Sequence, residues 1–325
     1  MSLWVTSMTC GTTPPSLPGV PLTLSPDPRL RLTLLGGYLG AGKTTWLRHH
    51  IHNQTTPPWV IVNEASDTPV DDLLLQAAAG VSLVSGGCAC CTALPALLTT
   101  LRQLCDQRPN LPSDIILETS GLADPAAIIA ALRADPLLAH HILLAETVVA
   151  VDGQYALAHL QRDALCRQQI IAADRLLVTK ADLAPTPALL GTLAALNPTA
   201  FVIGLAYGLP YPLPAPGPPI LLGHADAPPL QAITLALDMP VDWPALTLWL
   251  SALLVAHGDR ILRVKGVVRT PAGRLLLQTV RHAVAAPELL PDTPSPHDDH
   301  LAILGHGIDA DQLARSLRRF GHSVG

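Results

Sequence analysis

Short apolar runs alternate with amphipathic stretches along the first two thirds of the chain. The apolar runs lie at residues 30–35, 59–62, 81–84, 115–117, 147–151, 175–178 and 201–204. Segments between them, such as 94–104 and 125–132, have apolar residues at helical spacing. Continuous apolar strands that alternate with helices are typical of a parallel sheet covered by helices on both faces. The pattern therefore predicts an α/β domain with a mostly parallel sheet.

The pattern changes at residue 207. Residues 207–229 contain eight prolines, which indicates a semi-rigid linker rather than a packed element. Beyond it the sequence predicts strands at 230–237, 261–269, 274–282 and 301–305 and helices at 244–257 and 309–319. We expect a flexible leader at 1–28, the α/β domain at 29–206, the proline-rich linker at 207–229 and a smaller α+β domain at 230–325.

Composition narrows the class of protein. The chain has 325 residues with 49% apolar and 14% charged side chains, which predicts a folded protein with a sizeable core. A net charge of −5 gives no electrostatic reason for a nucleic-acid partner. No apolar run reaches the length that spans a membrane, and the N-terminus lacks the basic start of a signal peptide. We therefore expect a cytoplasmic protein with neither a nucleic-acid nor a membrane partner.

The first candidate site follows the apolar run at 30–35. Gly37, Gly42, Lys43 and Thr44 stand at the spacing G-x-x-x-x-G-K-T, between a predicted strand and a predicted helix. In such a loop, backbone N–H groups and the helix N-terminus surround phosphate. Lys43 would reach the β- and γ-phosphates, and the Thr44 hydroxyl would bind Mg²⁺. The alternative, a glycine-rich turn with an incidental lysine, does not explain why motif and context agree.

A second candidate stands at the end of the apolar run at 115–117. Glu118 follows that run directly, where an acid on a neighbouring strand makes a water-mediated contact with Mg²⁺. Gly121, slightly further on, would let its backbone N–H approach the γ-phosphate. A carboxylate in this position is also a common helix cap, so the functional interpretation depends on the phosphate loop upstream.

A third motif, Thr179-Lys180-Ala181-Asp182, follows the apolar run at 175–178. An Asn/Thr-Lys-x-Asp stretch at a strand end binds guanine, because the aspartate accepts from two N–H groups of the base and the lysine stem packs over the base. Adenine has no matching donors, so the motif favours GTP over ATP. A solvent-exposed charged loop is the alternative. Lysine is scarce here, with three among 20 basic residues, and Lys43 and Lys180 both stand in nucleotide motifs.

Three of the six cysteines crowd into one segment, at Cys88, Cys90 and Cys91. Such crowding does not resemble a disulfide framework in a chain of this size. Thiolates at a predicted helix N-terminus are ligands for Zn²⁺, Co²⁺ or Cu(I), and a carboxylate or His from elsewhere would complete a tetrahedral site. Glu64, after the apolar run at 59–62, is a candidate donor. A redox pair and buried apolar packing are the alternatives.

The remaining polar clusters carry less information. His49, His50 and His52 follow the phosphate loop, and we expect them at the surface of a helix. The stretch His297-Asp298-Asp299-His300 has side chains that can bind a surface metal, but a solvated loop is the expectation.

Together these motifs resemble the CobW-like branch of the CobW/HypB/UreG GTPases, in the SIMIBI class. The resemblance covers residues from about 32 to 320. It is carried by residues 37–45, 62–64, 87–91, 118–125, 179–183, 197–198 and 261–266. The stretch Gly87-Cys88-Ala89-Cys90-Cys91, placed between the first two nucleotide motifs, is highly specific.

The resemblance implies a GTP-hydrolysing metallochaperone. Such a protein binds Mg²⁺-GTP and a transition metal, here Zn²⁺ or Co²⁺, and delivers the metal to a client protein or cofactor pathway. The nucleotide site would comprise Gly37, Gly40, Ala41, Gly42, Lys43, Thr44, Thr45, Glu118, Gly121, Thr179, Lys180 and Asp182, with Lys43, Thr44 and Glu118 as its catalytic members. The transition metal would be held by Cys88, Cys90, Cys91 and Glu64.

The chain departs from the family after Glu64. It has Asn63-Glu64-Ala65-Ser66-Asp67 where the family has Asn-Glu-Phe-Gly-Glu, so the conformation of this switch loop does not follow from the resemblance. A P-loop ATPase or kinase with a redox cysteine cluster is one alternative function. A non-catalytic, nucleotide-gated interaction module is another. The sequence is compatible with a homodimer.

Overall fold

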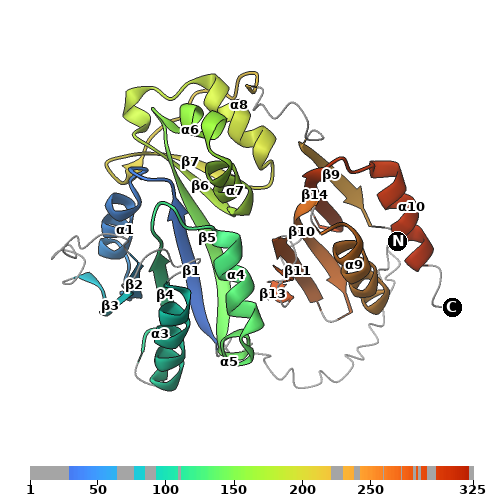
Figure 1. Cartoon of the computed structure of the whole chain (residues 1–325), viewed down its shortest axis with the longest axis horizontal. Coiled ribbons are helices and arrows are strands. Elements are labelled where there is room, and N and C mark those ends of the chain that lie inside the picture. Colours follow the sequence, from blue (N-terminus) through green and yellow to red (C-terminus); the bar gives the residue numbers. More distant parts are fainter. Residues whose placement is uncertain are drawn as a thin grey trace, which may run out of the picture.

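The computed structural model describes residues 29–63, 77–84, 93–108, 111–220, 230–237, 242–258, 260–271, 273–280, 283–284, 287–290 and 298–321. These residues form two sheets, each with its own helices (Figure 1). The first sheet lies within residues 30–210 and the second within residues 230–306. Among the described helices, none is long and apolar enough to cross a membrane.

The first sheet has the strand order β3-β2-β4-β1-β5-β6-β7-β8. All neighbours are parallel except β7 and β8. The mostly parallel sheet predicted from the apolar runs is therefore confirmed. Its strands are β1 (Leu30–Gly37), β2 (Trp59–Asn63), β3 (Gly80–Val84), β4 (Asp114–Glu118), β5 (Ile142–Asp152), β6 (Arg175–Thr179), β7 (Phe201–Ala206) and β8 (Leu209–Pro210).

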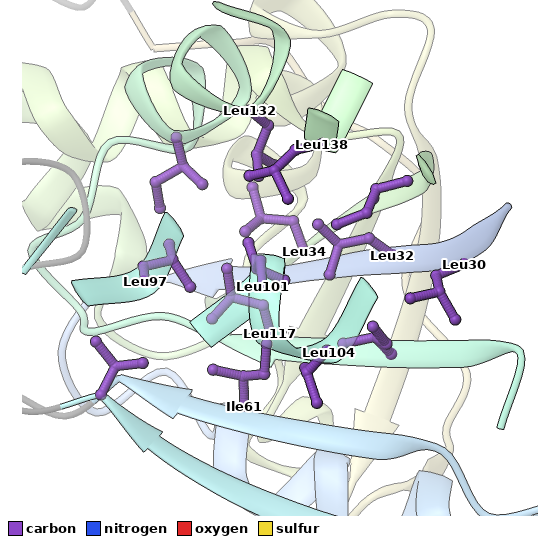
Figure 2. Close-up of a cluster of buried hydrophobic side chains, with 14 of the residues drawn as sticks. Leu30, Leu32, Leu34, Ile61, Leu97, Leu101, Leu104, Leu117, Leu132 and Leu138 are labelled. Carbon is purple, nitrogen blue, oxygen red and sulfur yellow. The ribbon is translucent and has the colours of Figure 1, made fainter. Parts of the chain in front are cut away.

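Helices cover both faces of this sheet, because adjacent residues of a strand point to opposite sides. Leu34 packs with Leu97 of α3 and Leu132 of α4 in the cluster of Figure 2. The next residue, Leu35, packs instead with Trp46 of α1. The helices are α1 (Lys43–His52), α3 (Leu94–Asp106), α4 (Pro125–Ala134), α5 (Pro136–His141), α6 (Ala156–Arg162), α7 (Ala164–Ala172), α8 (Pro187–Leu196) and the short 3₁₀ helix η2 (Ala181–Leu183).

The second sheet is antiparallel, with the order β12-β11-β10-β14-β9 and with β13 paired to β11. Helices α9 and α10 pack on it in one apolar cluster, in which Trp249 is buried and its indole N–H donates to Ser316 Oγ at 3.0 Å. The predicted α+β domain is thus present. Its elements are β9 (Leu230–Ala236), α9 (Trp243–His257), β10 (Ile261–Thr270), β11 (Gly273–Val280), β12 (Ala283–Val284), β13 (Glu288–Leu290), β14 (His300–His306) and α10 (Ala310–Gly321).

The two domains meet where β10 faces the end of α7. Arg263 on β10 is buried, and its guanidinium donates to the carbonyl oxygens of Ile171 and Ala173 and pairs with Asp174. Lys265 reaches the same carboxylate at 3.1 Å. Burial alone would raise the pKa of Asp174, but the charges of the two cations outweigh it and hold that pKa below its usual range. At this junction, the buried charges are therefore neutralised by ion pairs and hydrogen bonds between the two domains.

The proline-rich segment packs on the first domain, which corrects the expectation of an unpacked linker. β8 lies inside this segment and pairs with β7. Further on, the Gly217 N–H donates to the Pro187 carbonyl at 2.8 Å. A Cβ on Gly191 of α8 would lie 1.8 Å from the Gly217 carbonyl oxygen, so the two backbones are in direct contact. Residues 221–229 lie outside the described part of the chain.

Candidate functional site

Three of the loops that the sequence singled out follow β1, β4 and β6. These strands run parallel, so their carboxyl ends meet at one edge of the sheet. Residues 38–42 connect β1 to α1, residues 119–124 connect β4 to α4, and Lys180 follows β6. The topology therefore places the predicted phosphate, Mg²⁺ and guanine groups at the same edge.

The loop between β1 and α1 allows a ligand to approach its backbone closely. Gly40 and Gly42 have φ of 71° and 82°, left-handed conformations that glycine adopts without strain, and Gly42 caps α1. Lys43 Nζ donates to the carbonyl oxygens of Gly37 at 3.0 Å and Tyr38 at 3.4 Å. These are neutral acceptors in the lysine's own loop. Phosphate oxygens are charged and form stronger hydrogen bonds, so they can replace these carbonyls.

The pair predicted to bind Mg²⁺ is in direct contact. Thr44 Oγ1 donates to Glu118 Oε1 at 2.6 Å, and Glu118 is 4% exposed. Thr44 stands in the first turn of α1, and Glu118 ends β4, the strand beside β1. A hydroxyl and a carboxylate are the hard oxygen donors that Mg²⁺ prefers, usually with several waters. The donor set therefore fits Mg²⁺.

The loop after β4 lies directly on the phosphate loop. A Cβ on Gly121 would lie 2.7 Å from the backbone nitrogen of Leu39, so a larger residue would displace the loop. The Ala123 N–H donates to the Ser120 carbonyl at 3.1 Å and closes a turn. The Ser120 hydroxyl is buried and has no hydrogen-bond partner among the described residues. Such a group is costly unless a ligand or water satisfies it.

The loop after β6 is fixed to the phosphate loop. Thr179 Oγ1 donates to the Ala41 carbonyl at 2.9 Å. Lys180 has a φ of 54°, and its Nζ bonds to the Asp152 carboxylate at 2.5 Å. Asp152 ends β5 and also accepts two backbone N–H groups of the following turn. Sequence reasoning missed Asp152, and the available signal was its place directly after the apolar run at 147–151.

A cavity of about 330 Å³ opens between these loops, the size of a small-ligand pocket. Its walls include the predicted residues Gly42, Thr45, Thr179, Lys180 and Asp182, together with Trp46, Leu183, Leu205, Tyr207 and Gly208. The Asp182 carboxylate makes no hydrogen bond or ion pair with any residue that the structure describes. Sequence reasoning missed Trp46 and Tyr207, since no motif marks these aromatic residues.

Four predicted metal ligands lie outside the described residues: Glu64, Cys88, Cys90 and Cys91. The strand ends that precede them are adjacent, because Asn63 and Val84 are register partners and Asn63 Nδ2 donates to the Val84 carbonyl at 3.1 Å. β2 also pairs with β4, the strand that ends at Glu118. The part of the chain that the structure describes contains no group of three or more His, Cys, Asp or Glu side chains placed to hold a metal.

Two described cysteines differ from a metal-binding thiolate. Cys105 on α3 and Cys166 on α7 are buried free thiols. Burial raises the pKa of Cys166 to about 12 and also raises the pKa of Cys105. Both thiols are therefore protonated near neutral pH, and a protonated thiol is a poor metal ligand and nucleophile. Their side chains serve the apolar packing around α3 and α7.

Comparison with known proteins identifies relatives of both domains. Residues 31–201 match the nucleotide-binding domain of CobW/HypB/UreG, and residues 230–321 match the cobalamin synthesis protein CobW C-terminal domain. The zinc chaperone YjiA of Escherichia coli (strain K12) is 29% identical over 279 residues, which cover 79% of this chain and 88% of that protein. The zinc chaperone CobW of Pseudomonas aeruginosa is 29% identical over 354 residues, with 89% and 91% covered.

A solved structure shows the same fold. The crystal structure of Zn(II)-bound YjiA GTPase from E. coli has a TM-score of 0.61 with this chain, at 24% identity, and the match covers 90% of this chain and 99% of that one. The two domain matches follow one another in the order that the sequence pattern predicts, and the first alone spans more than half of the chain. The chain belongs to the CobW/HypB/UreG family.

Proposed function

We propose that this chain hydrolyses GTP and uses the hydrolysis cycle to deliver a transition metal to a client. The observation that carries the nucleotide assignment is Asp182, whose carboxylate lines the cavity beside Lys180 without a partner among the described residues. Guanine offers two adjacent N–H donors to such a carboxylate, whereas adenine has a ring acceptor beside its amino group and does not match it. A partly buried carboxylate without a hydrogen-bonding partner is unfavourable, so a bound guanine accounts for its presence.

In this proposal, guanine binds beside Asp182, and the phosphates bind beside Lys43 in the loop between β1 and α1. Lys43 exchanges the carbonyl oxygens of its own loop for phosphate oxygens, and backbone N–H groups at the N-terminus of α1 would add further donors to the phosphates. Thr44 and Glu118 hold Mg²⁺, with Glu118 acting through water. When bound, Mg²⁺ neutralises charge on the transferred phosphoryl group. The chain's own residues contribute positioning and charge stabilisation around an in-line water.

Nucleotide turnover tests this part of the proposal. We expect the full chain to hydrolyse GTP and Lys43→Ala to lose about 100-fold or more in kcat, because a fixed charge at the phosphates is removed. GTP should bind more tightly than ATP. Tighter ATP binding would favour the ATPase or kinase alternative. Wild-type turnover no faster than that of Lys43→Ala would favour the non-catalytic interaction module.

The metal is proposed to bind to Cys88, Cys90, Cys91 and Glu64, a thiolate and carboxylate set suited to Zn²⁺. The names of the relatives as zinc chaperones support zinc, and Co²⁺ is the other candidate. The adjacent ends of β2 and β3 support the pairing of the Glu64 loop with the cysteine segment. Mg²⁺-GTP would order these loops and tighten metal binding, and hydrolysis would release the metal to a cytoplasmic metalloprotein or metal-cofactor pathway.

Metal titration with a matched cysteine control tests the proposed ligands. Zn²⁺ and Co²⁺ affinities are measured with and without Mg²⁺-GTP for the native chain, Cys90→Ala/Cys91→Ala and Cys105→Ala/Cys166→Ala. The first variant should lose at least about tenfold in affinity, and the second should bind as the native chain does, since its thiols are buried with raised pKa values. Equal affinity for all three proteins would reject the cysteine site. Equal native affinity with and without nucleotide would reject the coupling.

A further inference from the structure

Helix α7 carries a buried amide that belongs to none of the nucleotide motifs. Gln169 is 1% exposed and is followed by the apolar residues Ile170 and Ile171. Its Nε2 donates to the carbonyl oxygens of Gly121 at 3.2 Å and Ala123 at 2.8 Å. A buried amide costs desolvation free energy that a leucine would avoid, unless its N–H groups are used. The hydrogen bonds to Gly121 and Ala123 therefore explain why an amide is buried at position 169.

That loop is anchored on both sides of its turn. On the strand side, the Thr119 N–H donates to the Leu35 carbonyl at 2.9 Å, which continues the ladder between β1 and β4. On the helix side, Gln169 holds Ala123. Between the two anchors lies Ser120, whose buried hydroxyl has no partner among the described residues. Gln169 therefore supplies the helix-side anchor of the turn that lies on the phosphate loop.

Helix α7 is itself fixed to the phosphate loop. Asp163 caps α7 by accepting the Leu165 N–H at 2.8 Å, and it also accepts from the Tyr38 hydroxyl at 2.8 Å. This hydrogen bond raises the pKa of Tyr38, so the phenol stays protonated and continues to donate. At the opposite end, the Ile171 carbonyl accepts from Arg263 of the second domain. Gln169 thus stands on a helix that contacts both the phosphate loop and the second domain.

We propose that Gln169 is a positioning residue for GTP hydrolysis. By holding the carbonyl groups of Gly121 and Ala123 toward α7, it sets the orientation of the peptide units that follow these two residues, because the C=O of one residue and the N–H of the next belong to one planar unit. This fixes the turn for contact with the γ-phosphate. Gln169 touches neither nucleotide nor Mg²⁺ and acts only through the loop. The proposal rests on the proposed GTPase function and adds a residue to it.

Two variants of Gln169 in the full chain test the proposal. Gln169→Leu keeps the side-chain volume and removes both donors. We expect kcat for GTP to fall about tenfold while GDP affinity stays within about twofold, because GDP has no γ-phosphate. Gln169→Glu places carboxylate oxygens against two carbonyls, and protonation restores one donor. Its kcat relative to the native chain should therefore rise as the pH is lowered from about 8 to about 6.

Asn197→Ala is the matched control, because Asn197 is another buried amide that bonds to α7, from its place at the C-terminal end of α8. Its Nδ2 donates to the carbonyl oxygens of Ile170 and Ala173, both at 2.8 Å, at the end of α7 beyond Gln169. We expect lower thermal stability with native kcat. Native kcat in Gln169→Leu, or the same loss of kcat in Gln169→Leu and Asn197→Ala, would overturn the proposal. Native turnover no faster than that of Lys43→Ala would instead reject the GTPase function itself.

Discussion

The charged side chains of the nucleotide edge and those of the domain junction differ in their bonding partners. At the nucleotide edge, Lys43 is bonded to carbonyl oxygens of its own loop, and Asp182 makes no hydrogen bond or ion pair within the described structure. At the junction, Arg263 is 3% exposed and is bonded to two carbonyls and to Asp174, which Lys265 also reaches. The polar groups at the nucleotide edge can therefore accept a ligand, whereas those at the junction are already bonded to other protein groups.

This difference predicts different effects when charged residues are replaced in the two regions. A ligand can replace the contacts of Lys43 without exposing a buried charge, because the carbonyls that it leaves are ordinary loop groups. Removing Arg263 at the junction leaves the buried Asp174 carboxylate with less compensating charge. Variants at the nucleotide edge should therefore change ligand binding with little effect on stability, and variants at the junction should do the reverse.

The largest effect is expected for Arg263→Leu. Loss of the guanidinium leaves the buried Asp174 with Lys265 as its one charged partner among the described residues and removes the Arg263 donors from two buried carbonyls, so unfolding should cost about 3–5 kcal/mol less free energy. Urea unfolding of the full chain measures this. The control is Arg175→Ala, which breaks the partly exposed pair with Glu146 and should change stability by about 0.5 kcal/mol. Equal effects of the two variants would remove the contrast between the two regions.

Lowering the pH should reduce the free energy of unfolding by less than Arg263→Leu does. Burial raises the pKa of Asp174, but Arg263 and Lys265 bring it below its usual range. A carboxyl with a lowered folded-state pKa contributes stability above its unfolded-state pKa of about 3.9 and loses it as the pH falls through the folded-state value. The urea midpoint should therefore fall more steeply below about pH 5 for the native chain than for Asp174→Asn. Parallel pH profiles would contradict this role.

Asp182→Ala tests the nucleotide edge in the same comparison. We expect the ratio of ATP to GTP dissociation constants to fall by about 10–100-fold, since hydrogen bonds to a charged group contribute about 1.5–3 kcal/mol. The free energy of unfolding without nucleotide should stay within about 0.5 kcal/mol of the native value. Isothermal titration and urea unfolding provide the two measurements. A stability loss as large as that of Arg263→Leu would place Asp182 with the structural charges.

The smallest effect is expected at a helix cap of the first domain. Asp135 Oδ1 accepts the N–H groups of Leu137 at 3.0 Å and Leu138 at 3.2 Å, so Asp135→Ala should cost about 1–2 kcal/mol of unfolding free energy. Arg102 pairs with the same carboxylate, but its side chain is 50% exposed, so Arg102→Ala should cost about 0.5 kcal/mol. Thermal unfolding compares the two. A larger loss in Arg102→Ala would show that the ion pair outweighs the cap.

The elements that could be predicted from the sequence are those whose signal is local. β1 is one example, because Leu34 and Leu35 are both fully buried on opposite faces, and a strand covered on both sides requires apolar residues at consecutive positions. The phosphate loop is another, since glycines and a lysine at fixed spacing between a strand and a helix have a direct backbone reason.

Partners that come from distant strands could not be predicted in this way. Asp298 and Asp299 were expected in a solvated loop, and that expectation is wrong, because both are buried and paired with Arg274 and Arg269 of the β10–β11 hairpin. Gln169 escaped notice for the same reason, since its partners stand 46 and 48 positions earlier in the chain. The Glu64 loop and the cysteine segment lie outside the described residues, so the metal half of the site stays a prediction.

The packed proline-rich segment limits how far the two domains can separate. The Ile220 N–H donates to Thr192 Oγ1 of α8 at 3.0 Å, and the second sheet begins at Leu230. A stretch of about ten residues spans at most about 35 Å when fully extended. A second domain released from the junction would therefore remain tethered at an effective concentration in the millimolar range. Re-docking of such a domain is then an intramolecular step.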